Sequence, residues 1–391
     1  MVSIARKNLF QDLPRFVVAQ AGIMFAVSLV TIQTGIFNGF TRSTSVLIDN
    51  SDADIWVASE DVRHLELTLP IPLQRLNQAR QVTGVDRAEA LIVQSRLWRN
   101  ASSQLNPVRV IGFDPNGQLF KPWHITQGSI NQLKQPYTVM LDKSDLAGLN
   151  VKGIGDVAEV GSFRARVVGI TKGIRSIVSN AFMFTSLENA RAYNNSPITT
   201  PADNPPAPPK LTSTDGISYV LVRAQPGQDL QALKRELEAA LPDTRAYTRA
   251  EMADLTQTYW QKATSVGFIL GLGAVVGMIV GIVIVGQILY SSVTDHLKEF
   301  GTLKAMGSSD WFIYGVIIEQ ALWMAVLGYL PGMALCFGLG AWTLETQGIT
   351  ILIGSTTAAG VFGVTILMCI GAAVFAIQKV TRLDPAIVFR A

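Results

Sequence analysis

The chain has 391 residues, of which 49% are hydrophobic, and its formal net charge at pH 7 is only +3. A nearly neutral chain gives no reason to expect a nucleic-acid partner. Cys336 and Cys369 both lie in apolar runs near the C-terminus, so the long polar middle of the chain has no cysteine for a disulfide framework. The three histidines, His64, His124 and His296, are scattered along the sequence. We therefore expect no metal site and no cofactor.

Four apolar stretches are long enough to cross a membrane, since a helix needs about 20 apolar residues to span the hydrocarbon. They cover residues 16–40, 266–289, 311–342 and 351–377. The first is too long for the apolar core of a signal peptide, and no A-x-A cleavage site follows it, so we expect an uncleaved span. The sequence therefore predicts a membrane bundle of four helices.

Lysine and arginine in the short flanks of these spans predict their orientation. They occur in the N-terminal tail, in the loop between the second and third spans and in the C-terminal tail. The loop between the third and fourth spans contains Glu345 but no lysine or arginine. Short cytoplasmic flanks carry an excess of lysine and arginine. We therefore expect a multi-pass protein of the inner (plasma) membrane, with both termini in the cytoplasm and residues 42–260 in the periplasm.

The segment outside the membrane is predicted to be a mixed α+β domain between the first and second spans. Helical patterns cover residues 72–80, 187–193 and 229–240, and residues 197–209 form a proline-dense surface segment. Runs typical of strands cover residues 54–58, 90–98, 108–113, 137–141, 158–160, 164–170, 181–185 and 218–222. No convincing acid–base or nucleophilic set is present, so we predict that the chain is not an enzyme.

Three regions follow from these patterns. Residues 1–41 form an N-terminal helix and the first span, residues 42–260 form the outer domain, and residues 261–391 form the remaining spans and the cytoplasmic tail. From Arg249 the pattern is helical, and neither glycine nor proline interrupts it before the second span. We therefore expect one rigid stalk helix that runs from the outer domain into the membrane.

Glycines at G-x-x-x-G spacing mark the second and third spans, and such small residues let helix backbones approach closely in lipid. They are Gly267, Gly271, Gly273, Gly277 and Gly281 in the second span and Gly328 and Gly332 in the third. These glycines could serve packing within one bundle or packing between the two copies of a dimer, and the sequence does not distinguish the two. Glu319 is the acidic residue inside the third span, and we interpret it as structural or helix-orienting rather than as part of an ion pathway.

The loop between the second and third spans carries an amphipathic pattern. The spacing from Ser292 to Asp295 fits a capping box that opens a short helix. Phe300, Leu303 and Met306 then fall on one face of that helix, and Gly307 suits a helix stop. Such a helix either lies passively on the membrane or docks into a groove of a cytoplasmic partner.

The same loop resembles a known family signature. Residues 298–307 read KEFGTLKAMG, similar to the R-E-I-G-x-L-R-A-L-G signature of FtsX-like ABC permeases. Residues 382–390 resemble the closing R-x-x-P-x-x-x-L-R of that family, and residues 5–9 resemble the helix before its first span. Glu319 and the Gly328–Gly332 stretch match its third span. The chain thus resembles the FtsX/MacB/LolC-E-like ABC transporter permeases, most closely the DevC-type stand-alone permease subunits.

The resemblance implies a mechanism and partners. Two permease copies, identical or paralogous, would work with a separate cytoplasmic ABC ATPase, a periplasmic adaptor and a TolC-like outer-membrane channel, and membrane lipid would surround them. The sequence contains no G-x-x-x-x-G-K-[ST] phosphate loop, so ATP hydrolysis is expected in the partner. The residues implied to couple to that ATPase are Lys298, Glu299, Phe300, Gly301, Leu303, Lys304, Ala305, Met306 and Gly307.

The function predicted from this resemblance is export of a lipid, glycolipid or other amphipathic substrate. Three alternatives stay open. The first is lipoprotein release by a LolC/E-like permease, and the second is an FtsX-like regulator of cell-wall hydrolases that transports nothing. The third is a membrane-anchored enzyme, against which the absence of a recognisable catalytic set argues.

Overall fold

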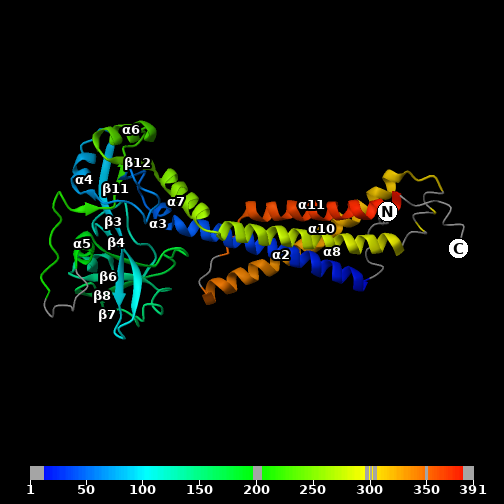
Figure 1. Ribbon diagram of the computed structural model, residues 1–391, viewed down its shortest axis with the longest axis horizontal. Helices are drawn as coiled ribbons and strands as arrows, with labels where there is room; N and C mark the ends of the chain where they lie inside the picture. The colour runs from blue at the N-terminus through cyan, green and yellow to red at the C-terminus, as the bar shows by residue number, and fades with distance from the viewer. Residues whose placement is uncertain are drawn as a thin grey trace. The chain divides into compact units, whose positions relative to one another are not determined.

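The computed structural model describes residues 13–196, 205–295, 306–347 and 351–381, together with Glu299 and Thr302. The chain divides into two compact units. A helical unit holds the described residues up to Gly39 and those from Thr264 onward, and an α/β unit holds Phe40–Ala263 (Figure 1).

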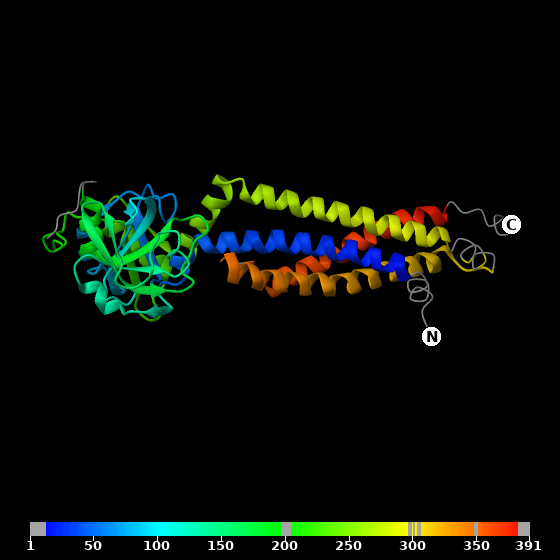
Figure 2. The same ribbon diagram turned by 90° about the horizontal axis from the view of Figure 1, so that it is seen from below.

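The helical unit is built from four long helices, each long and apolar enough to cross a membrane. The predicted number of spans is therefore confirmed. The helices are α2 (Leu13–Thr44), α8 (Val266–Asp295), α10 (Asp310–Gln347) and α11 (Ser355–Thr381). Figure 2 shows α2 lying between α8 and α10. All four contribute to one apolar cluster, represented by Ala26, Val285, Ala321 and Cys369, in which small side chains allow close helix packing.

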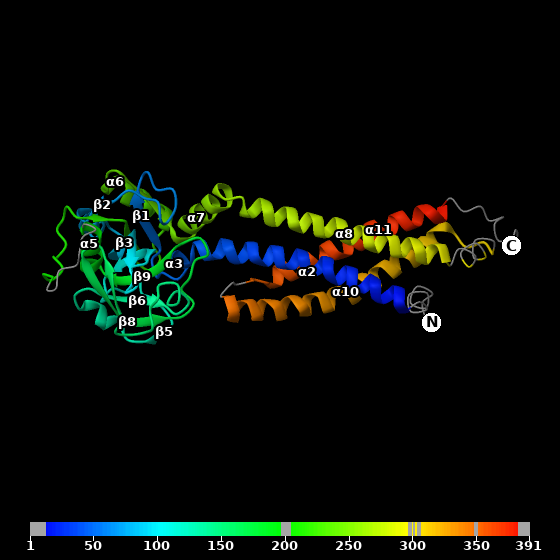
Figure 3. The same cartoon turned by 60° about the horizontal axis from the view of Figure 1, so that its bottom comes forward.

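The α/β unit is organised around one large mixed sheet with strand order β12-β1-β11-β3-β4-β9-β6-β8-β5, while β7 pairs with both β3 and β8 (Figure 3). The pairs β4–β9 and β6–β8 are parallel, and β2 and β10 form a separate two-stranded sheet. The strands are β1 (Ile55–Ser59), β2 (Ile71–Pro72), β3 (Val85–Arg99), β4 (Leu105–Phe113), β5 (Ile125–Gln127), β6 (Thr138–Asp142), β7 (Val157–Val160), β8 (Phe163–Thr171), β9 (Ala181–Ser186), β10 (Gly216–Ile217), β11 (Tyr219–Ala224) and β12 (Thr244–Thr248).

The central part of the sheet is buried on both faces. In β1, Ile55 and Val57 belong to one apolar cluster, whereas Trp56 and Ala58 belong to another. Successive side chains of a strand point to opposite faces, so a continuous apolar run is what a strand between two cores requires. The remaining helices that cover these cores are α3 (Val46–Asp49), α4 (Gln74–Ala79), the 3-10 helix η1 (Ile130–Lys134), α5 (Leu187–Asn195), α6 (Leu230–Ala240) and α7 (Arg249–Ala263).

The expected uninterrupted stalk helix is wrong. The helix α7 ends at Ala263 and α8 begins at Val266, with Thr264 and Ser265 outside both. The carbonyl of Ser265 accepts a hydrogen bond from the N–H of Ile269 at 2.9 Å, which is the first backbone bond of the new helix. Serine favours such a position before a helix because its side chain competes for backbone groups.

The predicted capping box is also wrong. Ser292 to Asp295 form the last turn of α8 rather than the start of a new helix. The hydroxyl of Thr294 donates to the carbonyl of Tyr290 at 2.8 Å. A hydroxyl that bonds to the preceding turn can continue a helix as readily as it can cap one, and the apolar span before it extends through these residues.

Candidate functional site

The glycines of the second span pack within the bundle against α2. A Cβ atom placed on Gly277 would lie 2.8 Å from Cδ2 of Leu29, and one placed on Gly273 would lie 2.6 Å from Nε2 of Gln33. A Cβ atom placed on Gly281 would lie 2.8 Å from the Cβ atom of Ala26 and would also contact Met368 of α11. The two helices run in opposite directions along this contact, and the absence of side chains brings their backbones together.

The glycines of the third span play the same part on the other side of α2. A Cβ atom on Gly328 would lie 2.5 Å from Cγ2 of Ile23, and one on Gly332 would lie 3.0 Å from Cγ1 of Val27. The hydroxyl of Ser28 donates to the carbonyl of Gly332 at 3.4 Å. Therefore α2 fits between two glycine-bearing helices.

One face of α8 is not used in this packing. No described atom lies within 4 Å of a Cβ placed on Gly271, and Gly267 is half-buried. Of the four spans, α8 buries the smallest share of its most apolar window. Its exposed side chains include Phe268, Leu272, Val275, Val276, Ile279 and Val283. This face is available to lipid or to another transmembrane helix.

Some polar side chains lie inside the spans. Glu319 is half-buried, and its neighbour Gln320 is only 1% exposed. Within the described part of the chain, the amide groups of Gln320 and of Gln20 on α2 have no hydrogen-bond partner. Sequence reasoning noticed Glu319 but missed Gln320, although an amide directly beside an intramembrane acid is a visible signal.

Only part of the predicted coupling loop lies among the described residues. Glu299 and Thr302 are helical and exposed, and the carbonyl of Thr302 accepts from the N–H of Met306 at 2.9 Å. The side chain of Met306 is 70% exposed, and Gly307 has φ +92°, which suits a helix stop. The other predicted positions fall outside the described residues, namely Lys298, Phe300, Gly301, Leu303, Lys304 and Ala305.

The start of α10 adds apolar side chains beside this loop that sequence reasoning did not single out. The carbonyl of Ser309 accepts from the N–H of Phe312 at 3.0 Å, so Ser309 acts as the helix cap. Trp311 is 82% exposed, and its ring centroid lies 6.0 Å from that of Tyr314. Exposed Met306 and Trp311 therefore flank the turn at Gly307.

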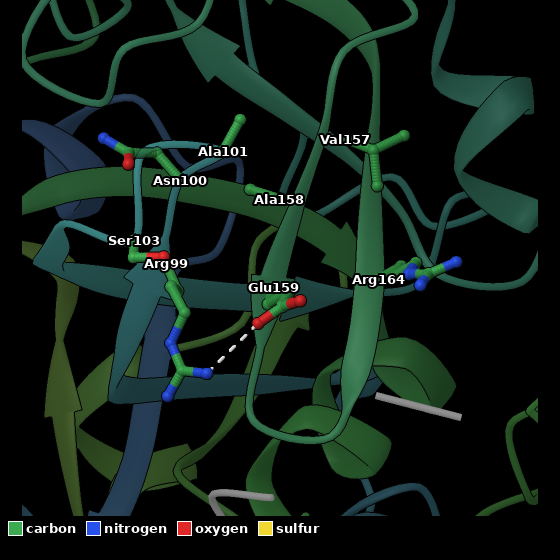
Figure 4. Close-up of a pocket in the computed structure, with 8 residues that line it drawn as sticks. All are labelled: Arg99, Asn100, Ala101, Ser103, Val157, Ala158, Glu159 and Arg164. Atoms are coloured by element: carbon green, nitrogen blue, oxygen red, sulfur yellow. Dashed lines mark hydrogen bonds and ion pairs between the residues drawn. The ribbon is translucent and has the colours of Figure 1, made fainter. Parts of the chain in front are cut away.

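The α/β unit has a hollow of about 280 Å³ near the β3–β4 turn and the β7–β8 hairpin. Figure 4 shows Arg99 pointing toward Glu159, and a guanidinium nitrogen of Arg99 lies 3.3 Å from a carboxylate oxygen of Glu159. The other lining residues supply no nucleophile–base pair. Among the described residues, no group of three histidine, cysteine or acidic side chains could hold a metal ion.

His64 is the most perturbed described histidine. It lies in a loop, as expected, but only 6% of it is exposed. Its ring stacks on Tyr259 of α7 with centroids 4.3 Å apart. Burial, helped by the charge of Arg109, lowers the pKa of His64 to about 4. Arg109 itself pairs with Glu66, and both side chains are largely buried. The imidazole is therefore held in its neutral form inside the α/β unit.

Comparison with known families identifies both units. Residues 16–240, more than half of the chain, match the MacB-like periplasmic core domain, and residues 271–385 match the FtsX-like permease C-terminal domain. The chain belongs to the MacB/FtsX-like family of ABC transporter permeases. The family predicted from the loop signature and the two chain ends is therefore confirmed.

Relatives extend over nearly the whole of this permease. An uncharacterized ABC transporter permease of Mycobacterium tuberculosis is 24% identical over 377 residues, which cover 95% of this chain and 94% of that protein. The probable syringafactin export ATP-binding/permease protein of Pseudomonas syringae is 23% identical over 390 residues, covering 95% of this chain and 56% of that protein. Among solved structures, the periplasmic region of MacB from Actinobacillus actinomycetemcomitans aligns with 52% of this chain and 92% of its own, at 10% identity and a TM-score of 0.35.

Proposed function

We propose that this protein is the permease subunit of an ABC-type exporter that couples a separate cytoplasmic ATPase to movement of its α/β unit. The observation that supports this most is the similarity over 95% of the chain to a protein named as an ABC transporter permease. Two other relatives are named for export of syringafactin and of macrolides. The proposed cargo class is accordingly a lipid, glycolipid or other amphipathic molecule, as for a DevC-type subunit.

The proposed location is the inner membrane, with both termini in the cytoplasm and the α/β unit in the periplasm between the first and second spans. The asymmetry of lysine and arginine in the short flanks supports this orientation. The match of residues 16–240 to a domain described as periplasmic agrees with it.

The way the two units are linked supports mechanical coupling. The helix α2 continues without a break from Leu13 to Thr44, past the boundary between the units at Gly39 and Phe40. The second link is interrupted, because Thr264 and Ser265 separate α7 from α8. One stiff helix and one jointed connection would let a displacement of the spans turn the outer unit.

The proposed contact with the ATPase is the loop from Lys298 to Gly307, which joins α8 to α10. Its exposed Met306, with Phe300 and Leu303 at helical spacing, provides apolar anchors for a groove on the ATPase. Trp311 is also exposed, and we propose that its side chain adds to the same apolar surface. Closure of the ATPase around nucleotide would then move α8 and α10 together.

The proposed assembly contains two permease copies, identical or paralogous, and works with an adaptor and an outer-membrane channel. Because Gly273, Gly277 and Gly281 are already used against α2 and α11, the remaining exposed face of α8 is the candidate for contact with the second copy.

The test is purification of the tagged full-length chain from its native membrane, followed by quantitative mass spectrometry. We expect an ABC ATPase and two permease chains for every pair of ATPase subunits. Co-purification of a cell-wall hydrolase without cargo lipid would favour the regulator instead. An active assembly with one permease chain would refute the two-copy arrangement.

A further inference from the structure

Asp142, the last residue of β6, is a buried carboxylate that accepts hydrogen bonds on both oxygens. One oxygen accepts from the N–H and the hydroxyl of Ser144, at 3.0 and 2.8 Å. The other accepts from the hydroxyl of Thr171 and the N–H of Ile174, at 3.0 and 2.9 Å. Hydrogen bonds from four donors favour the charged form of a carboxylate. Asp142 therefore places a fixed negative charge inside this end of the sheet.

Asp145 lies three residues further on and lacks such partners. Its N–H donates to the carbonyl of Asp142 at 3.0 Å, which holds it beside that charge. Its Oδ2 atom is buried without a hydrogen-bond partner among the described residues. Burial and the charge of Asp142 raise the pKa of Asp145 to about 6, although Arg175 of the β8–β9 loop acts in the opposite direction. An ionised carboxylate in this position lacks the donors that would offset its burial.

The loop that follows is closed by backbone bonds beginning at Asp145. The N–H of Leu149 donates to the carbonyl of Asp145 at 3.0 Å, and the N–H of Val151 donates to the carbonyl of Leu146 at 2.8 Å. Leu149 and Val151 are both buried in the same apolar cluster. A displacement of Asp145 would therefore release two side chains from the core.

The same loop also holds the rim of the hollow shown in Figure 4. The side-chain amide of Asn150 donates to the hydroxyl of Ser102 in the β3–β4 turn at 3.2 Å. The indole N–H of Trp98, near the end of β3, donates to the carbonyl of Leu149 at 3.3 Å. The residues of that turn that line the hollow are Asn100, Ala101 and Ser103. Opening of the loop would thus free one side of the hollow.

We propose that Asp145 is a proton-controlled latch for the β6–β7 loop, residues 143–156. When its carboxyl group is neutral, the loop is closed on the core and holds the β3–β4 turn. When the group is ionised, its repulsion by Asp142 and its missing hydrogen bonds favour the open loop, and Arg175 only moderates that repulsion. The inference rests on the α/β unit alone and does not depend on export.

The test is hydrogen–deuterium exchange of the full-length protein in detergent at pH 5.0 and pH 7.5, corrected for the intrinsic exchange rate. The peptide of interest covers residues 143–151. Opening returns the pKa of Asp145 from about 6 to its ordinary value near 3.8. Linkage of protonation to opening then predicts about tenfold greater protection at pH 5.0. Equal protection at the two pH values in the unsubstituted protein would overturn the proposal, and that measurement needs no variant.

Asp145→Asn assigns the effect to this residue, because an amide has the shape of the neutral carboxyl group and carries no charge. The variant should be protected at both pH values. Asp156→Asn is the matched control in the same loop, since its carboxylate accepts from the N–H of Lys152 at 2.6 Å. That control should keep the tenfold dependence. His64 titrates in all three proteins, so its effect cancels. A pH dependence that persists in Asp145→Asn would overturn the proposal.

Discussion

Gly277 of α8 lies so close to Leu29 of α2 that a Cβ atom on the glycine would be 2.8 Å from Cδ2 of the leucine. A real Cβ atom essentially never approaches that closely, so any larger residue must push the two helices apart. Contacts of this kind recur at Gly273 and Gly328. They place α2 between α8 and α10, and they allow the packing of these glycines to be tested by substitution.

Gly277→Leu should therefore destabilise the helical unit. Overpacking of a close contact typically costs about 1–3 kcal/mol, and the several added carbons place this change at the upper end of that range. Thermal unfolding of the full-length protein in detergent checks the effect. Gly338→Leu, on α10, is the matched control, because no described atom lies within 4 Å of a Cβ at that position. Equal losses of stability in the two variants would contradict the assigned packing.

His64 should make stability depend on pH. Its pKa is lowered to about 4 by burial and by Arg109, whereas an unfolded histidine titrates near 6.5. Between these values the unfolded chain binds a proton that the folded chain does not. The contribution of His64 to the free energy of unfolding is therefore constant above pH 6.5. Between pH 6.5 and about 4 this contribution falls by about 1.4 kcal/mol per pH unit as the pH is lowered.

His64→Gln removes this titration. The variant should be less stable than the parent protein at pH 7.5, because the ring contact with Tyr259 is lost. The difference in free energy of unfolding between the parent protein and the variant should become smaller as the pH falls from 6.5 toward 5. Asp145, whose pKa is raised to about 6 by burial and by Asp142, acts in the opposite direction. Its contribution is common to both proteins and cancels in the difference. A gap that is identical at pH 7.5 and pH 5 would show that His64 is not buried in its neutral form.

The proposed topology predicts which positions are accessible from outside. The test uses a variant of this protein in which Cys336 and Cys369 are replaced by alanine. In intact spheroplasts, Pro205→Cys in this variant should react with an impermeant thiol reagent and Gly301→Cys should not. Both should react after the membrane is opened, which controls for local accessibility. The physical reason is the distribution of lysine and arginine in the short flanks. Labelling of position 301 but not 205 in intact spheroplasts would reverse the orientation.

Long elements with a clear period could be predicted from the sequence. All eight predicted strands correspond to strands, because runs such as β1 and β11 alternate between two apolar cores. The missed strands β2, β5 and β10 have two or three residues, too few to show a period. The fourth missed strand, β12, sits beside a helix pattern and has only one fully buried residue.

Features that depend on tertiary contacts could not be predicted. The G-x-x-x-G motif indicated close packing but not which helix the glycines pack against. Only the fold shows that Gly277 of α8 packs against α2, whereas Gly271 is exposed. The break at Thr264 and Ser265 contains no glycine or proline, and the capping preference of serine alone does not reveal where a helix stops. Burial of His64 likewise depends on α7, which lies almost 200 residues away in the chain.

The central claim is that the loop from Lys298 to Gly307 transmits the closure of a partner ATPase to α8 and α10. The direct measurement is ATPase binding and stimulation by the full-length permease with Phe300, Leu303 and Met306 changed to alanine, singly and together. Burial of one such side chain contributes about 1.5–3 kcal/mol, so each loss should weaken docking by about one to two powers of ten if the side chain is fully desolvated. Lys304→Glu should do less, because exposed ion pairs contribute about 0–1 kcal/mol. Membrane insertion and the stability of the α/β unit should not change. Coupling that is unaltered in the triple alanine variant would contradict the account and make the loop a passive connector.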